Sequence, residues 1–176
     1  MIISVDEAKS LANVAGWTDS KIVMRIKAIE QTIRAYTNNN FQVRGIRARA
    51  DIVTGVFRGC PPGLFQPGDT VQVSGSEFNA GLFTVFRVDE AEISMMEPVV
   101  DEPGVLLTKV VYPADVVACA LNLLEWEVNN REKVGIQSET LSRHSVTYYN
   151  MDGTNNVMGY PASLLGALKP YRKARC

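Results

Sequence analysis

The sequence is poor in the residues that build catalytic and metal sites. Its 176 residues include one histidine, His144, and three widely separated cysteines, Cys60, Cys119 and Cys176. One histidine cannot form a histidine-rich metal site, and no cysteine pair has the close spacing of a zinc or redox motif. The GxxxxGKS or GxxxxGKT loop that cradles phosphates is also missing. We therefore expect no metal, no cofactor and no enzymatic activity. The cysteines are interpreted as reduced thiols, with Cys119 in a helix core.

Long apolar runs and an excess of one charge are missing as well. No stretch reaches the about 18 apolar residues of a membrane span, and the first residues lack the basic and apolar regions of a signal peptide. Eighteen basic residues nearly balance nineteen acidic ones, for a formal net charge of −1. This balance gives no reason to expect nucleic acid or membrane as the main partner, and it favours association between copies. A hydrophobic content of 46% suffices for one packed domain, or one domain with an insertion.

The first 42 residues predict two helices. Ser4 and Glu7 have the spacing of a capping box, which predicts a short helix ending near Val14. Thr18 can cap a second helix, which Asn38 and its asparagine neighbours should end. Its apolar stripe consists of Ile22, Ile26, Ile29, Ile33 and Tyr36. Its basic residues are expected to face water, namely Lys21, Arg25, Lys27 and Arg34.

Between about residues 43 and 111 the apolar pattern changes to a period of two, and glycine and proline become frequent. Short strands are expected over 46–52, 71–73, 82–88 and 105–111, with another near Ile93, and turn signals lie between them. This spacing is typical of a small barrel or sandwich.

The remainder returns to helical patterns. A helix should start at Pro113 and end near residues 129–130, with a buried stripe of Val117, Ala120, Leu121, Leu124 and Val128. Residues 131–160 are polar, with an extended stretch over 145–149. Pro161 should open a short helix that Pro170 stops before a basic tail. Its apolar residues are Leu164, Leu165 and Leu168.

Helical stripes on both sides of the β region need partners, and the simplest partners are each other. The predicted fold is therefore α+β, a small bundle of about four helices interrupted by a β-barrel-like or β-sandwich insertion. Residues 1–42 and 112–176 should form the bundle, with a long loop and a C-terminal tail. Residues 43–111 should form the inserted β module.

Charge is uneven along the chain although its sum is small. Basic residues crowd the early part, at Lys21, Arg25, Lys27, Arg34, Arg44, Arg47 and Arg49. Acidic residues crowd the later part of the β module, at Glu77, Asp89, Glu90, Glu92, Glu97, Asp101 and Glu102. These runs indicate either two solvated faces or a head-to-tail arrangement in which the basic face of one subunit meets the acidic face of another.

The order of elements and several local motifs resemble the head–tail connector adaptors of tailed phages. Residues 3–9 are similar to that family's acidic-capped first helix, residues 26–41 to its second helix, and residues 112–116 to its Tyr-Pro-x-Asp helix start. The C-terminal third follows the family's order closely, over 135–140, 145–148, 159–161 and 168–172. Residues 68–85 resemble the β module that some members carry.

The resemblance implies a virion structural protein, an adaptor subunit of the ring that joins the portal of a phage head to the tail, assembled in the host cytoplasm. Its partners would be the portal protein, neighbouring copies in a dodecameric ring and a stopper or tail protein. DNA would pass through the channel without sequence-specific binding, and no membrane would be involved.

The resemblance also implies that the 132–159 loop faces neighbours or the channel and that the tail docks on the portal. The loop candidates are Ser138, Glu139, Arg143, Val146, Tyr148 and Tyr149. The tail candidates are Lys169, Tyr171, Arg172, Lys173 and Arg175. An extended stretch can pair edge-on with another chain, and a cationic tail with a tyrosine anchor suits an acidic or aromatic groove. The alternative for the tail is a solvated terminus.

Three other functions remain open. The chain could be a neck stopper or tail-terminator ring protein. It could be a nucleic-acid-binding β module that uses Arg44, Arg47 and Arg49 with stacking by Phe41 and Phe57, although the acidic half of the module would repel phosphate. An enzyme would have to use His144 as a general base, whereas the favoured interpretation of His144 is an exposed polar residue.

Overall fold

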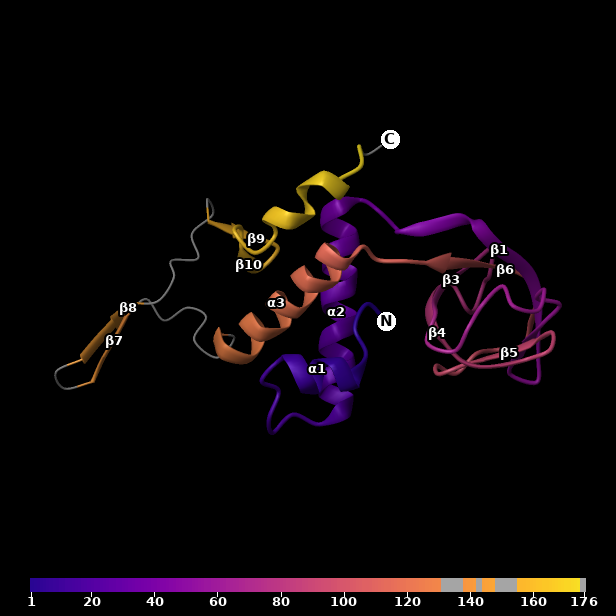
Figure 1. The fold of residues 1–176 in the computed structure, drawn as a ribbon, viewed down its shortest axis with the longest axis horizontal. Helices are drawn as coiled ribbons and strands as arrows, with labels where there is room; N and C mark the ends of the chain where they lie inside the picture. Colours follow the sequence, from indigo (N-terminus) through magenta and orange to yellow (C-terminus); the bar gives the residue numbers. More distant parts are fainter. Residues whose placement is uncertain (131–137, 142–143, 148–154, 175–176) are drawn as a thin grey trace. The chain divides into compact units, whose positions relative to one another are not determined.

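The protein is α+β, as predicted, with helices and a closed six-stranded antiparallel barrel (Figure 1). The computed structural model describes residues 1–130, 138–141, 144–147 and 155–174. The chain divides into two compact units. The barrel unit comprises Met1 and Asn40–Tyr112, and the helical unit comprises Ile2–Asn39 and Pro113–Cys176.

Helix α1 (Val5–Leu11) begins at the predicted capping box. The Ser4 hydroxyl accepts the Glu7 backbone N–H at 3.2 Å, and the Glu7 carboxylate accepts the Ser4 backbone N–H at 2.8 Å. The helix ends at Leu11 and not near Val14, because Ala12 leaves the helical conformation for an extended one.

Helix α2 (Asp19–Thr37) has Thr18 as its N-cap and Asn38 in the left-handed conformation at its C-cap, as predicted. The four isoleucines of the predicted stripe are buried. The expectation for Tyr36 was wrong, since Tyr36 is half-buried and Thr37 occupies the buried position. Arg25, Lys27 and Arg34 also differ from their expectation, because they are half-buried instead of facing water.

Helix α3 (Ala114–Asn130) packs on α2, which confirms the predicted helix pairing. Its buried face is rotated from the predicted one, and Val117, Leu121 and Val128 are only half-buried. The buried residues are Val116, Cys119, Ala120, Leu123, Leu124 and Glu127. The physical reason is that α3 contacts α1, α2 and the C-terminal 3-10 helix, so that it buries a wide face.

That C-terminal element is a 3-10 helix, η2 (Gly166–Tyr171), which packs on both α2 and α3. The predicted helix from Pro161 was wrong in its bounds. Pro161 lies in the two-residue strand β10 (Tyr160–Pro161), which pairs with β9 (Asn156–Val157), and Pro170 lies inside η2 instead of stopping it. Leu165 and Leu168 are fully buried, as their apolar pattern indicated.

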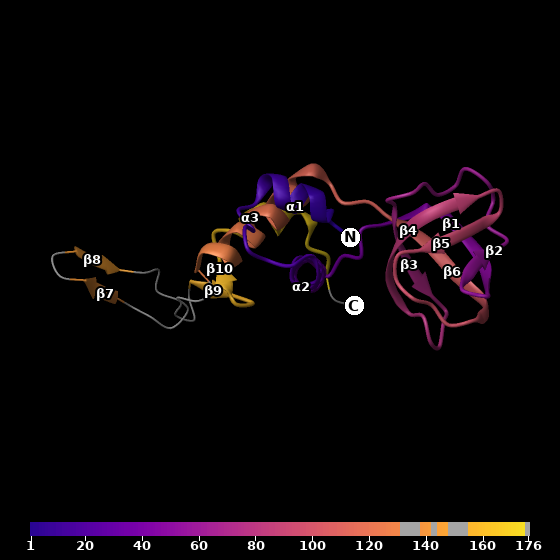
Figure 2. The same ribbon diagram turned by 90° about the horizontal axis from the view of Figure 1, so that it is seen from below.

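The barrel consists of β1 (Gln42–Val53), β2 (Val56–Arg58), β3 (Thr70–Ser74), β4 (Gly81–Asp89), β5 (Glu92–Met95) and β6 (Glu102–Val110). Around the barrel the strands follow the order β1-β2-β5-β4-β3-β6, and β6 pairs with β1 to close it (Figure 2). Alternating residues of β1, among them Ala48, Ala50 and Ile52, point into the core, where Phe57 and Phe65 are the largest side chains.

The two chain connections of the barrel lie beside each other. The Val111 backbone N–H donates to the Phe41 carbonyl at 3.0 Å, and the rings of Phe41 and Tyr112 lie 5.0 Å apart. Gln42 pairs with Val110 at the adjoining ends of β1 and β6. The chain therefore enters and leaves the barrel at one place, between α2 and α3.

Candidate interaction surfaces

The C-terminal segment is bound to the helices of its own unit. The Tyr171 hydroxyl donates to the Asp115 carboxylate at the start of α3 and lies 2.8 Å from each oxygen. This hydrogen bond raises the pKa of Tyr171 above its ordinary value. Tyr171, the residue expected to anchor a partner, thus contacts its own chain.

The main chain beyond η2 follows the C-terminal end of α2. The Lys173 backbone N–H donates to the Thr37 carbonyl at 2.8 Å, and the Asn38 side-chain amide donates to the Ala174 carbonyl at 2.9 Å. The asparagines predicted only to end α2 therefore also bind the tail.

The cationic side chains of this tail are exposed to solvent. Lys169, Arg172 and Lys173 are exposed, and Lys169 and Lys173 form no ion pair within the described part of the chain. The Arg172 guanidinium lies 5.2 Å from the centroid of the Tyr36 ring, a cation–π distance. Arg175 lies outside the described residues.

A buried polar cluster joins α2, α3 and β10. The Glu127 carboxylate, only 3% exposed, accepts the Tyr160 hydroxyl at 2.6 Å and lies 3.3 Å from the Arg25 guanidinium. The rings of Trp126 and Tyr160 meet edge to face at 5.4 Å. Glu127 precedes residues 131–154 and Tyr160 follows them, so this cluster joins described elements on either side of the candidate loop.

Within that segment the structure describes one hairpin, β7 (Ser138–Leu141) paired with β8 (His144–Thr147). Glu139 is paired with Val146, so three candidate loop residues, Ser138 among them, lie in paired strands. The hairpin forms a separate two-stranded sheet. Arg143, Tyr148 and Tyr149 lie outside the described residues.

The basic residues of the barrel fall into two groups. Arg44, Arg47 and Arg49 are exposed on β1 and have no ion pair among the described residues. The other three are paired within the barrel, as Arg58–Glu92 at 3.0 Å, Arg87–Asp89 at 2.7 Å and Lys109–Asp69 at 2.7 Å. The β1 arginines are thus the cations that the barrel leaves available.

The aromatic residues suggested for base stacking cannot serve that purpose. Phe57 is fully buried in the barrel core and Phe41 is 7% exposed. That part of the nucleic-acid interpretation is wrong, because Phe57 alternates into the core and Phe41 packs on Tyr112.

Two of the acidic residues hold barrel loops in place. Asp101 accepts both backbone N–H groups of the β1–β2 turn, at 2.9 and 3.0 Å. Glu102 accepts the Ser76 hydroxyl at 2.5 Å and the Glu77 backbone N–H at 2.6 Å, and these bonds lower the pKa of Glu102 to about 2. Neither carboxylate is therefore a free charge for a partner.

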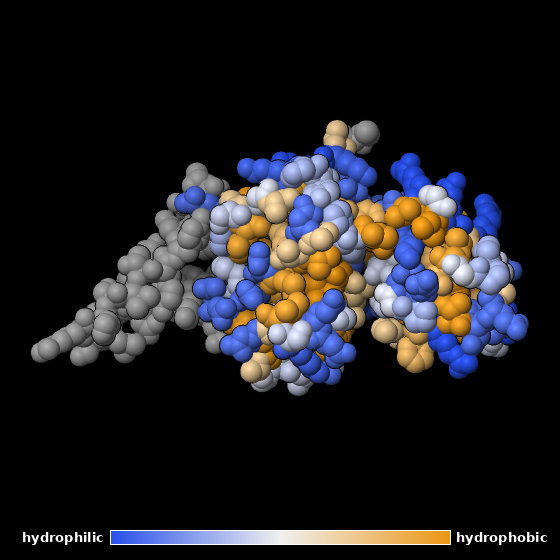
Figure 3. Space-filling model, viewed as in Figure 1, coloured by the Kyte–Doolittle hydropathy of each residue, from blue (hydrophilic) through white to orange (hydrophobic). Residues whose placement is uncertain are grey.

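Apolar side chains also reach the barrel surface, where Figure 3 shows hydrophobic residues among hydrophilic ones. Phe86 on β4 and Met96 just after β5 are 61% and 57% exposed, and Phe78 in the β3–β4 loop is exposed as well. Sequence reasoning missed this surface, since the strand pattern did not identify the register irregularity at Val85/Arg87, where Phe86 lies.

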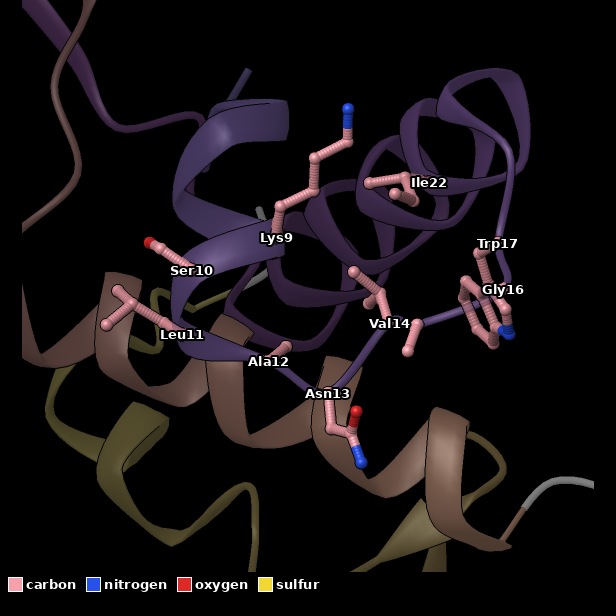
Figure 4. A pocket seen from close by; sticks show the side chains of 10 residues that line it. Lys9, Ser10, Leu11, Ala12, Asn13, Val14, Gly16, Trp17 and Ile22 are labelled. Atoms are coloured by element: carbon pink, nitrogen blue, oxygen red, sulfur yellow. The ribbon is translucent and has the colours of Figure 1, made fainter.

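A groove of about 560 Å³ lies beside the α1–α2 connection (Figure 4). Ser10 and Leu11 project to one side of α1, whereas Val14, Trp17 and Ile22 gather on the other. Lys21 covers the Trp17 ring at 4.1 Å. The groove is open and has no cluster of titratable groups that indicates a reaction.

Within the described residues, no three His, Cys, Asp or Glu side chains are grouped so as to hold a metal ion. Burial raises the pKa of both Cys60 and Cys119 to about 11. Among the described helices, none combines the length and apolar character required to cross a bilayer.

Searches of protein-family models and of curated proteins gave no match to this chain.

Proposed function

We propose that this chain is a virion structural protein, an adaptor subunit of the ring that joins the portal of a tailed-phage head to its tail. In this role it binds other proteins and catalyses no reaction. Its partners are the portal protein, neighbouring copies and a stopper or tail protein, around a channel through which DNA passes.

The observation that carries the proposal is the construction of the helical unit. α2 and α3 pack together across the barrel insertion, and η2 and the tail are fastened to both helices. Lys169, Arg172 and Lys173 nevertheless remain exposed. A fixed backbone with exposed cations loses little conformational entropy on binding, which suits an acidic groove on a partner.

The β7–β8 hairpin supports the same function. A two-stranded sheet has an outer edge on each strand, and such edges can pair with a strand of another chain. The Glu127–Tyr160 bond joins α3 and β10, the described elements before and after residues 131–154.

Electron microscopy of the protein mixed with the portal protein of the same phage tests the proposal. We expect a ring of this chain stacked on the narrow end of the portal, and a mixture in which no complex forms would refute it. Lys169→Glu should weaken portal binding, because it reverses an exposed tail charge. The matched control Lys21→Glu, an exposed charge on α2, should bind as the unaltered chain does.

A second candidate function is binding to the nucleic-acid backbone, which the exposed arginines of β1 favour. Salt-dependent shifting of duplex DNA in a gel, lost in an Arg47→Glu/Arg49→Glu variant, would support it. No shift at low salt would remove it.

A further inference from the structure

The wall of the barrel formed by β1 is cationic. Ala48 and Ala50 point into the core, so the intervening Arg47 and Arg49 point outward, and Arg44 is exposed on the same strand. The barrel unit has nine acidic and six basic residues, a formal net charge of −3. β1 holds three of the six basic residues and one acidic residue, Asp51, so the rest of the unit carries eight acidic and three basic residues.

The strand order places β4 opposite β1. Two strands separate them in each direction, β2 and β5 on one side and β6 and β3 on the other. In a closed barrel, the outward side chains of β1 and those of β4 therefore point in opposite directions.

The wall formed by β4 and β5 has complementary chemistry. Phe86 and Met96 expose large apolar surfaces there, and the turn between the strands carries the exposed acidic residues Asp89 and Glu90. Asp89 is bound to Arg87, whereas Glu90 has no ion pair within the described part of the chain. An apolar centre with a charged rim is the usual composition of a protein interface.

We propose that the barrels of two copies bind head to tail, with the β1 wall of one copy on the β4–β5 wall of the next. The arginines pair with Glu90 of the neighbour and with Asp89, whose carboxylate stays exposed beside Arg87, and a guanidinium stacks on the neighbour's Phe86 ring. Because the two walls lie on opposite sides of each barrel, the contact is heterologous and propagates from copy to copy, as a ring requires. The inference rests on the proposed adaptor function. It adds which surfaces of neighbouring copies meet and that the copies are oriented head to tail.

Charge reversal in the full chain tests the pairing. Arg47→Glu/Arg49→Glu and Asp89→Lys/Glu90→Lys should each weaken self-association about tenfold or more, measured by sedimentation in low salt. An equimolar mixture of the two variants should associate again, because each reversed wall then meets a wall of opposite charge. Lys9→Glu/Lys21→Glu makes the same change in net charge at two exposed lysines of the helical unit, and this variant should associate normally.

A second pair of variants tests the apolar contact. Phe86→Ser should weaken association about tenfold, whereas Phe78→Ser, equally exposed but in the β3–β4 loop, should not. Both residues are exposed, so circular dichroism should show unchanged folding.

The proposal is overturned if the unaltered chain stays monomeric at its highest soluble concentration, if either reversal leaves association unchanged, or if the mixture fails to associate. Loss of duplex DNA binding in the arginine variant, without any self-association of the unaltered chain, would assign this wall to nucleic acid instead. A ring that stacks on the portal despite both reversals would refute the barrel contact and leave the adaptor function standing. Failure to stack on the portal with intact self-association would refute only the adaptor function.

Discussion

Replacing Tyr160 with phenylalanine should destabilise the helical unit. The change removes one hydroxyl, which donates to the Glu127 carboxylate at 2.6 Å. The ring remains, so its edge-to-face contact with Trp126 is preserved. The variant therefore isolates a single hydrogen bond.

The magnitude follows from burial. Tyr160 is 4% and Glu127 3% exposed, so water cannot replace the lost donor. A hydrogen bond to a charged group contributes about 1.5–3 kcal/mol, and the remaining Arg25 contact keeps the cost below the upper limit. We expect the free energy of unfolding to fall by about 2 kcal/mol. With an m-value of about 2 kcal/mol/M, the urea midpoint should fall by about 1 M.

Tryptophan fluorescence is a suitable assay. The chain has two tryptophans, Trp17 and Trp126, and both belong to the helical unit, so their signal follows this unit and not the barrel. The control is Tyr36→Phe, because the Tyr36 hydroxyl has no hydrogen-bond partner within the described part of the chain. That variant should change the free energy by less than about 0.5 kcal/mol. Equal midpoints for the two variants would refute the argument that the Glu127–Tyr160 hydrogen bond stabilises the helical unit.

Two further predictions concern titratable groups. The pKa of Glu102 is lowered to about 2, chiefly by the Ser76 hydroxyl, so its contribution to barrel stability is present above the ordinary value of 4.5 and is lost as the pH falls from 4.5 toward 2. Glu102→Gln should therefore reduce the decline in barrel stability over this range, measured by circular dichroism, and an unchanged pH profile would contradict the assignment. Cys60 and Cys119 are buried with pKa values of about 11, so a Cys176→Ser variant should react with a disulfide reagent at pH 8 only after unfolding. Rapid reaction of the folded variant would show that one of these thiols is accessible.

Local signals in the sequence predicted local structure well. The capping box at Ser4 and Glu7, the isoleucine stripe of α2 and the left-handed Asn38 depend on neighbours a few residues away, which the sequence displays directly. The alternation at Ala48, Ala50 and Ile52 likewise predicted the inward face of β1.

Errors arose where distant packing decides the outcome. α3 buries a wide face because several elements contact it, and this rotated its core from the predicted Val117, Leu121 and Val128. Glu127 continues the spacing of Leu123 and Leu124, which was an available signal, but a carboxylate is normally assigned to the surface unless its partner is known. That partner, Tyr160, is 33 residues away.

The candidate surfaces were predictable only in part. The arginine-rich start of the β module was visible in the sequence, as was the basic tail. The opposition of β1 and β4 was not, because it depends on the order in which six strands close the barrel. Nor did the sequence indicate that Tyr171 binds Asp115, a contact across 56 residues.

The chain enters and leaves the barrel at neighbouring residues, and this has a consequence for how such a protein can evolve. Because Phe41 and Val111 are hydrogen-bonded neighbours, an entire folding module enters and leaves the host scaffold at one point. Deleting it would require only a short bridge between adjacent backbone ends, and gaining it would leave the parent topology intact. Recombination at two codon boundaries, one beside residue 41 and one beside residue 111, would exchange, enlarge or remove the barrel.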